Sequence, residues 1–229
     1  VDCCGLTESA EHYPTARDIG IMSRELIIKY PKILEYSSIW MENITHVTRQ
    51  GSKEFGLTNT NKLLRSYKGC EGLKTGSTSL AKYCVSAVAS RNNITLISVV
   101  MAAPDYKVRF RDAAAMLNYG FSKCSLYVDE APEKLPSIEI QKGTKNTTEV
   151  KYEKNFRYLS TDGKTISEAE RKLNLESQVP APVKEGDIAG TLEYYVDGQK
   201  LGEINILFTE TIERATYKNC LEKIFAEAF

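Results

Sequence analysis

The sequence has little of what marks the specialised classes of protein. Its 229 residues carry 30 basic and 30 acidic side chains, so the net charge is zero. It therefore lacks the excess of positive charge that is typical of nucleic-acid binders. The longest apolar run, Ile94–Ala103, is interrupted by Thr95 and Ser98 and falls short of the roughly 20 residues that a membrane-spanning helix needs. With 42% hydrophobic and 26% charged residues, the composition is that of an ordinary globular protein.

Metal-binding patterns are scarce as well. The six cysteines form no Cys-x-x-Cys pair, and the only histidines are His12 and His46. A zinc site usually draws on paired ligands at short spacing, so we expect no metal. Cys70 and Cys84 flank a stretch that we interpret as a turn between strands, which leaves two readings open. They form a disulfide, or they are two small buried thiols.

Helical and extended patterns alternate in the first 122 residues. Residues 15–30 predict a helix in which Thr15 is the N-cap, Asp18 is the capping-box acid and Pro31 is the stop. Residues 37–66 are typical of an extended hairpin and loop, with glycines at 51 and 56.

Two apolar strands are predicted next, at 83–90 and 94–101. They are joined by the tight-turn sequence Arg91-Asn92-Asn93, and their continuous apolar character suits central strands covered on both faces. A helix from about 105 to 119 follows, with Gly120 as its C-terminal stop.

The pattern changes near residue 123, where we place a domain boundary. Short alternating segments at 125–128, 137–141, 149–152, 191–196 and 203–208 predict strands, and Asp162-Gly163 and Asp197-Gly198 are typical hairpin turns. Strands at this spacing indicate a small β-sandwich or barrel. The predicted domains are therefore residues 1–122 and 123–211, followed by an amphipathic helix at 212–229. Its mixed charge favours a docking helix or stalk over a membrane-surface helix.

The stretch that carries chemistry is Lys74-Thr75-Gly76, followed by Ser77 and Thr78. On a strand at a sheet edge, such a backbone can hydrogen-bond an extended peptide as an added strand would. A lysine ammonium favours a substrate carboxylate and can move a proton. Threonine and serine hydroxyls can bind the carboxylate directly, and glycine lets the substrate approach closely.

The residues around this motif extend the pattern. Leu57–Gly76 reads LTNTNKLLRSYKGCEGLKTG and resembles the N-x-N-x-L-L … G-x-x-G-x-K-T-G run of the low-molecular-weight penicillin-binding proteins. These are the serine-type D-alanyl-D-alanine carboxypeptidases of the peptidase S11 family. Further matches to that family are the strand pair over 80–100, Lys107, Arg109, Leu117, Tyr119, Gly120, Phe121, and the earlier Gly5, Leu6, Tyr13 and Ala16 to Ile19. The resemblance covers essentially the whole chain and is strongest over 57–121.

This resemblance implies an α+β fold. It would consist of the second half of a β-lactamase/transpeptidase-like domain, an antiparallel sheet with helices, then a small all-β sandwich-like domain and a C-terminal helix. It also implies hydrolysis of the terminal D-Ala-D-Ala bond of peptidoglycan stem peptides through a serine acyl-enzyme, with acylation of the same serine by β-lactams. No metal and no organic cofactor are implied. The expected location is extracytoplasmic, at the bacterial cell envelope, and membrane association through a segment after Phe229 is open.

The resemblance also assigns roles. Lys74 would be catalytic, and Thr75, Gly76, Ser77 and Thr78 would bind substrate. Arg109 would face the site and pair with the terminal carboxylate, a task that suits its forked guanidinium. The alternative for Arg109 is a solvated charge on a helix surface.

The chain departs from the family in one respect. In the family, the Ser-x-x-Lys motif with the nucleophile and a Ser-x-Asn motif both lie upstream of the region where this sequence begins. Ser79-Leu80-Ala81-Lys82 and Ser90-Arg91-Asn92 fit these patterns. The first directly follows Lys-Thr-Gly and leads into a strand, and the second lies in the far turn of the predicted hairpin, so we interpret both as coincidence.

We therefore expect the missing N-terminal half of the domain as a partner. Truncation, proteolysis or a natural protein without that half would each explain the sequence. An uncovered sheet edge and apolar face would favour low solubility or dimerisation. The alternatives in function are a non-catalytic wall-binding or scaffold module and, less favoured, a relative of the serine β-lactamases.

Overall fold

The computed structural model describes residues 14–130, 133–219 and 221. It divides into two compact units, which we describe separately: residues 1–125 with 161–163, and residues 126–160 with 164–229. The helices are α1 (Ala16–Lys29), α2 (Ile33–Ser37), α3 (Leu63–Ser66) and α4 (Tyr106–Lys123). The strands of the first unit are β1 (Met41–Thr48), β2 (Gly51–Thr58), β3 (Cys70–Thr78), β4 (Lys82–Arg91) and β5 (Ile94–Ala103).

The predicted capping box at the start of α1 is confirmed. The Thr15 hydroxyl accepts the backbone N–H of Asp18 at 3.2 Å, and the Asp18 carboxylate accepts the N–H of Thr15 at 2.8 Å. These contacts satisfy two donors that a helix start leaves without partners. The helix ends at Lys29, two residues before Pro31, as the sequence predicts.

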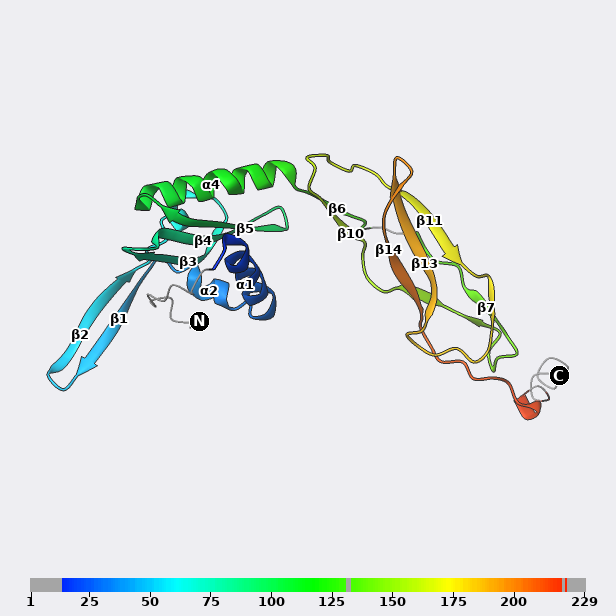
Figure 1. Cartoon of the computed structure of the whole chain (residues 1–229). Helices are drawn as coiled ribbons and strands as arrows, with labels where there is room; N and C mark the ends of the chain where they lie inside the picture. The colour runs from blue at the N-terminus through cyan, green and yellow to red at the C-terminus, as the bar shows by residue number, and fades with distance from the viewer. Residues whose placement is uncertain (1–13, 131–132, 220, 222–229) are drawn as a thin grey trace. The chain divides into compact units, whose positions relative to one another are not determined.

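An antiparallel sheet in the order β3-β4-β5 forms the centre of the first unit. The prediction of a central apolar strand is confirmed for β4, whereas β5, also predicted to be central, pairs with β4 alone among the described strands. Ser86 bonds Ser23 of α1 through their hydroxyls at 2.7 Å, whereas Val85 and Ala87 share a core cluster with residues of α4. Because successive strand residues point to opposite faces, α1 and α4 cover opposite faces of the sheet (Figure 1). The β4–β5 turn is also as predicted, since Asn92 and Asn93 both take positive φ.

The structure decides between the two readings for Cys70 and Cys84. Cys70 lies opposite Ala89 and Cys84 opposite Gly76, near the two ends of the strand pair, and both thiols are free, so no disulfide joins them. One prediction in this unit is wrong, because the helix α4 does not stop at Gly120 but continues to Lys123. Gly120 allows close packing instead, because a Cβ there would lie 2.7 Å from the Leu96 side chain.

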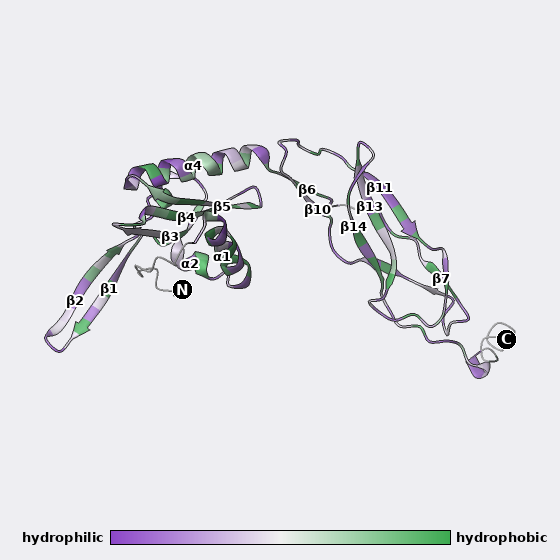
Figure 2. Ribbon diagram, in the orientation of Figure 1, coloured by the Kyte–Doolittle hydropathy of each residue, from purple (hydrophilic) through white to green (hydrophobic). Residues whose placement is uncertain are grey.

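The strands β1 and β2 form the hairpin predicted between 37 and 66. All sixteen residues of the two strands are exposed, and Ile44 lies opposite Phe55 in the register. The hairpin projects from the body of its unit (Figure 1). Figure 2 shows that apolar residues occur along it as well as along β4 and β5.

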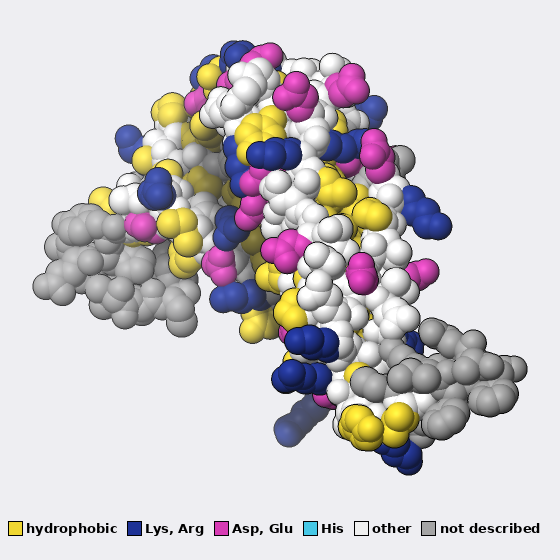
Figure 3. Space-filling model, turned by 90° about the vertical axis from the view of Figure 1, so that its right-hand side faces the viewer, with side chains coloured by type: hydrophobic (Ala, Val, Ile, Leu, Met, Phe, Trp, Pro, Cys, Tyr) yellow, Lys and Arg dark blue, Asp and Glu magenta, His cyan; other side chains and the backbone are white. Residues whose placement is uncertain are grey.

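The second unit is all β, as predicted. Its strands are β6 (Ser125–Val128), β7 (Ile138–Gln141), β8 (Thr147–Thr148), β9 (Val150–Tyr152), β10 (Arg157–Ser160), β11 (Glu170–Leu175), β12 (Gln178–Pro180), β13 (Ile188–Val196) and β14 (Gln199–Phe208). They form the sheets β11-β13-β14-β9, β12-β7-β8 and β10-β6. One core cluster centres on Tyr194 and Phe156, whose rings stack at 3.8 Å, and another on Ile138 and Ile212. Charged side chains of both signs are interspersed over the surface of this unit (Figure 3).

A buried carboxylate joins the strands of the second unit. Asp129 is 4% exposed, accepts the Tyr194 hydroxyl at 2.9 Å and pairs with the Arg171 guanidinium at 2.7 Å. Burial and the hydrogen bond to Asp129 raise the pKa of Tyr194 above its ordinary value. The hydroxyl therefore stays protonated and remains a donor.

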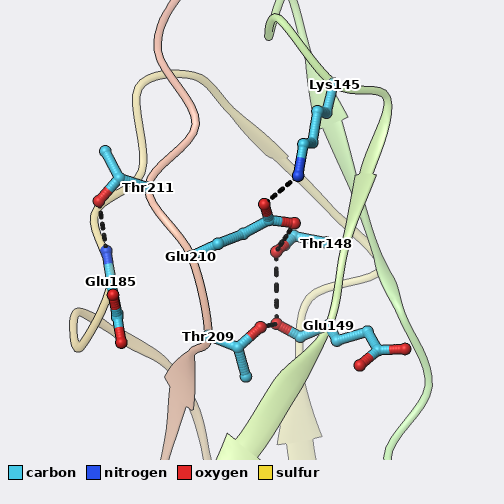
Figure 4. A network of polar contacts seen from close by, with 7 residues as sticks. All are labelled: Lys145, Thr148, Glu149, Glu185, Thr209, Glu210 and Thr211. Atoms are coloured by element: carbon cyan, nitrogen blue, oxygen red, sulfur yellow. Dashed lines mark hydrogen bonds and ion pairs between the residues drawn. The ribbon is translucent and has the colours of Figure 1, made fainter.

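A second polar network fastens the chain after β14 (Figure 4). Glu210 pairs with Lys145 and accepts the Thr148 hydroxyl, and the Thr209 hydroxyl donates to the carbonyl of Glu149 at 2.8 Å. These contacts link the segment after β14 to residues 145–149, in and around β8. Beyond them, Ile212 is 1% exposed and forms a β-bridge.

Two predictions for the second half need correction. Asp162-Gly163 is a bend and not a hairpin turn, because β10 pairs with β6 and β11 with β13. The terminal helix does not begin at residue 212, where the backbone is still extended; its described helical residues are 217–219 and 221. The rest of that predicted helix lies outside the described residues, as do Gly5, Leu6 and Tyr13.

Candidate functional site

The six residues singled out in the sequence lie around one groove on the first unit. Its volume is about 730 Å³. It is lined by Lys74, Thr75, Gly76, Ser77, Thr78 and Arg109, together with Ile19, Thr60, Cys84, Val85, Ser86, Val99, Val100 and Met101. The first five come from β3, which pairs with β4 alone among the described strands. The outer edge of β3 is therefore available to an extended peptide.

Polar contacts fix the start of this edge strand. The Ser37 hydroxyl donates to the carbonyl of Glu71 at 2.7 Å, and the buried Asn61 amide donates to the carbonyl of Gly72 at 2.9 Å. Gly72 has φ +155°, and a Cβ there would lie 2.4 Å from the Ser37 hydroxyl oxygen. The strand can therefore pass close to α2 only with glycine at this position.

Along the groove, the motif residues alternate between the two faces of the sheet. Lys74 lies opposite Ser86 and Thr75 opposite Val85. Lys74 is exposed, and its ammonium donates to the carbonyl of Thr75. No atom lies within 4 Å of the position that a Cβ of Gly76 would take. The backbone at Gly76 is therefore open to close approach by a ligand.

Arg109 is buried beside the groove and is not a solvated charge on the helix surface; its recorded hydrogen bonds go to backbone carbonyls. It is 7% exposed, and its Nη1 donates to the carbonyls of Gly76 at 3.1 Å and Cys84 at 3.2 Å. Its Nε has no hydrogen-bond partner among the described residues. Burial lowers the pKa of Arg109 from its ordinary value. Its guanidinium therefore holds β3 and β4 together at the level of Gly76.

The remaining motifs have structural surroundings. The Thr78 hydroxyl accepts the N–H of Ala81 at 2.9 Å in the turn that joins β3 to β4. Residues 79–81 form that turn, so Ser79 does not begin a helix. Ser90 lies near the far end of β4, where its hydroxyl donates to the Glu71 carboxylate at 3.0 Å. Neither serine has the placement of a nucleophile facing the groove.

The groove residues that sequence reasoning did not assign to the site include two that lie next to the motif. Thr60 lies between Asn59 and Asn61, and its hydroxyl is 2.6 Å from that of Thr75. Cys84 lies opposite Gly76. The signal that could have found Thr60 is the N-x-N spacing itself, because two asparagines that bind backbone groups fix the residue between them.

The described residues contain no group of three or more His, Cys, Asp or Glu side chains placed to hold a metal ion. Within the same residues, no helix has the length and apolar character needed to cross a membrane.

Comparison with known proteins decides the family. A family model described as "D-alanyl-D-alanine carboxypeptidase" (Peptidase_S11) matches residues 1–105, and one described as "Penicillin-binding protein 5, C-terminal domain" matches residues 122–214. The chain belongs to the peptidase S11 family of D-alanyl-D-alanine carboxypeptidases. It contains part of that family's catalytic domain, followed by the all-β C-terminal domain.

Individual relatives agree with this assignment. The chain is 29% identical to D-alanyl-D-alanine carboxypeptidase DacF of Bacillus subtilis over 97% of its own length and 56% of the relative's. It is 47% identical to a D-alanyl-D-alanine carboxypeptidase of Streptomyces sp. strain K15 over 64 residues, which are 28% of this chain and 22% of that one. The chain spans about half the length of most of the curated relatives it matches.

Solved structures agree with the fold. Penicillin-binding protein 5 of Haemophilus influenzae superposes with a TM-score of 0.64 at 26% identity, over 90% of this chain and 58% of that one. PBP3 of Streptococcus pneumoniae, described as a peptidoglycan synthesis regulatory factor, superposes with a TM-score of 0.60 at 23% identity, over 91% and 60% of the two chains.

Proposed function

We propose that this chain supplies the substrate-binding strand of a serine D-Ala-D-Ala carboxypeptidase that trims peptidoglycan stem peptides outside the cytoplasm. The observation that carries the proposal is the open edge of β3, where Lys74, Thr75 and Gly76 line one groove. A stem peptide would bind along this edge in extended form. Its terminal carboxylate would lie near the Thr75 hydroxyl and Arg109.

The reaction needs a nucleophilic serine, and we assign this role to neither serine of the groove, because Ser77 has the substrate-binding position after the Lys-Thr-Gly motif and Ser86 is buried against the Ser23 hydroxyl. In the assembled enzyme, the serine oxygen attacks the carbonyl carbon of the D-Ala-D-Ala bond, the terminal D-Ala leaves with a proton, and water hydrolyses the acyl-enzyme. β-Lactams acylate the same serine. Lys74 would contribute positive potential and a proton route. The nucleophile would come from the segment that precedes this region in the relatives.

An apolar surface on the first unit supports a partner segment. A groove of about 480 Å³ is lined mainly by α1 and α2 residues, among them Ile19, Met22, Leu26 and Tyr36. Met22 is 58% and Tyr36 60% exposed. Clusters of large exposed apolar side chains mark binding surfaces. We propose that the missing catalytic half covers this surface and that, without it, the chain is poorly soluble or dimerises.

Penicillin binding tests the proposal. The protein is prepared as this chain alone and as the full protein with its preceding segment, and both are treated with excess penicillin before denaturing intact-mass measurement. The full protein should gain the mass of one penicillin and release D-Ala from a D-Ala-D-Ala peptide, whereas the chain alone should gain nothing. In the full protein, Lys74→Met should lower the acylation rate at least about 100-fold. Lys172→Met on the exposed strand β11 is the matched control.

The second candidate function is a non-catalytic wall-binding or scaffold module. The observation that favours it is that Ser79 and Ser90 occupy hairpin positions rather than a helix start. Absence of a penicillin adduct on the full protein, together with retained binding to peptidoglycan, would support this alternative. A β-lactamase is less favoured, because residues 122–214 match the C-terminal domain of penicillin-binding protein 5.

A further inference from the structure

Thr60 contacts the Lys-Thr-Gly motif from outside the sheet. It lies in the loop between β2 and α3, and its hydroxyl oxygen is 2.6 Å from that of Thr75. This distance is within the range of a hydroxyl–hydroxyl hydrogen bond. Both residues line the groove. Thr60 therefore contacts Thr75, the residue that binds the substrate carboxylate in the proposed function.

The two neighbours of Thr60 fix its position. The Asn59 amide donates to the carbonyl of Ile39 at 3.0 Å, and its side-chain oxygen accepts the N–H of Asn61 at 2.9 Å. The Asn61 side chain is 2% exposed and donates to the carbonyl of Gly72 in β3 at 2.9 Å. The loop is thus bonded to the strand it faces. The hydrogen bonds of Asn59 and Asn61 to backbone groups therefore hold Thr60 beside Thr75 without involving the Thr60 side chain.

The direction of the Thr60–Thr75 hydrogen bond follows from the ligand. Each hydroxyl has one proton to donate and two lone pairs to accept. A carboxylate accepts only, so Thr75 must point its proton at the carboxylate. Thr75 then has no proton left for Thr60, and Thr60 must be the donor of the 2.6 Å bond.

We infer that Thr60 is a positioning residue that orients the Thr75 hydroxyl toward a terminal carboxylate. This inference rests on the proposed function and adds to it a determinant of specificity for the free acid. Consecutive hydrogen bonds polarise one another, so donation by Thr60 also strengthens the bond from Thr75 to the carboxylate. Without Thr60, the Thr75 side chain is free to leave its χ1 rotamer and turn its hydroxyl away from the carboxylate.

The test compares variants that differ in one hydroxyl. Thr60→Val keeps the shape of the side chain and removes the donor, and Thr60→Ser keeps the donor. Thr58→Val, on the exposed strand β2 two residues away, is the matched control. Each variant is made in the full protein and assayed with an acylated D-Ala-D-Ala peptide that ends in a free carboxylate, and with the same peptide ending in a carboxamide.

Thr60→Val should raise KM for the free acid about five- to tenfold, the loss expected for one hydrogen bond between neutral groups. Its kcat should change little, and its binding of the carboxamide, measured as KM or as an inhibition constant, should stay at the wild-type value. Thr60→Ser should restore KM, and Thr58→Val should behave as wild type. An unchanged KM in Thr60→Val, an equal loss for both peptides, or no rescue by serine would each overturn the inference.

A second readout needs no catalysis. In the full protein without substrate, the three-bond NMR couplings of the Thr75 methyl carbon to its backbone nitrogen and carbonyl report its χ1 rotamer. They should indicate one rotamer in the wild type and in Thr60→Ser, and averaging in Thr60→Val. Averaging already present in the wild type would contradict the inference. If the wild-type full protein neither binds penicillin nor releases D-Ala while these couplings behave as expected, the proposed function fails and the Thr60–Thr75 contact stands.

Discussion

The close approach of β3 to α2 predicts that two glycines of one strand differ sharply in their tolerance of a methyl group. Gly72→Ala places a Cβ at φ +155°, 2.4 Å from the Ser37 hydroxyl oxygen and 2.8 Å from its Cβ. Backbone strain of this kind costs about 1–3 kcal/mol, and overpacking adds about 1–3 kcal/mol. We expect Gly72→Ala to lower the free energy of unfolding of the first unit by about 2–6 kcal/mol, the sum of these two costs. Gly76→Ala meets no atom within 4 Å and should leave it unchanged or raise it by up to about 1 kcal/mol.

The assay is urea unfolding of the whole chain followed by tryptophan fluorescence. Trp40 is the single tryptophan, and it lies in the first unit beside the start of β1, so its signal reports that unit. The double variant Ser37→Ala/Gly72→Ala separates the two costs, because it removes the hydroxyl and keeps the positive φ. Against Ser37→Ala alone, Gly72→Ala should cost about 1 kcal/mol less than in the wild type. Equal unfolding free energies for Gly72→Ala and Gly76→Ala would refute the reasoning.

Three further predictions concern charged groups. Asp129→Ala leaves the buried Tyr194 hydroxyl unpaired and should lower the stability of the second unit by about 3 kcal/mol, measured by urea unfolding followed by circular dichroism. The Lys200 ammonium holds the pKa of Glu193 at about 2, below the ordinary 4.5. The stabilisation from the Glu193–Lys200 pair should therefore be complete above about pH 4.5 and disappear as the pH falls toward 2. An NMR titration of the Glu193 carboxyl in Lys200→Met should show a higher pKa for Glu193 than in the wild type. Arg109→Lys keeps the charge and loses the forked geometry, so penicillin acylation of the full protein should slow about tenfold. A wild-type acylation rate would contradict the role of Arg109 in holding β3 against β4.

Local signals in the sequence predicted the first unit well. The capping box of α1, the Asn92-Asn93 turn and the apolar run of β4 each depend on residues close in sequence, so the pattern alone determines them. The same is true of the Asp197-Gly198 turn, where both residues take positive φ between β13 and β14. The exposed hairpin β1–β2 was predicted from its glycines and alternation, although no core covers either face.

Errors arose where the outcome depends on strand register or on distant partners. The sequence left a Cys70–Cys84 disulfide open because the two residues flank a turn between strands, but residues 70–78 and 82–91 are both strands, and the register separates the two thiols. Gly120 looked like a helix stop because its packing against Leu96 is invisible in the sequence. The strands β10, β11 and β12 are short or exposed and pair with segments distant in sequence, so alternation alone did not reveal them.

Arg109 shows most clearly what a motif match can and cannot predict. The match assigned it to the carboxylate, and a solvated charge on the helix surface was the alternative. The structure instead buries its guanidinium over the rings of Tyr83 and Phe110. Its guanidinium holds the carbonyls of Gly76 and Cys84 and still has an unpaired Nε. Loss of activity in an Arg109 variant would therefore mix two effects, displacement of the strand and loss of a carboxylate partner. Two peptide ligands distinguish these effects. A displaced strand weakens the binding of free-acid and carboxamide peptides alike, whereas loss of a carboxylate partner weakens the binding of the free acid alone.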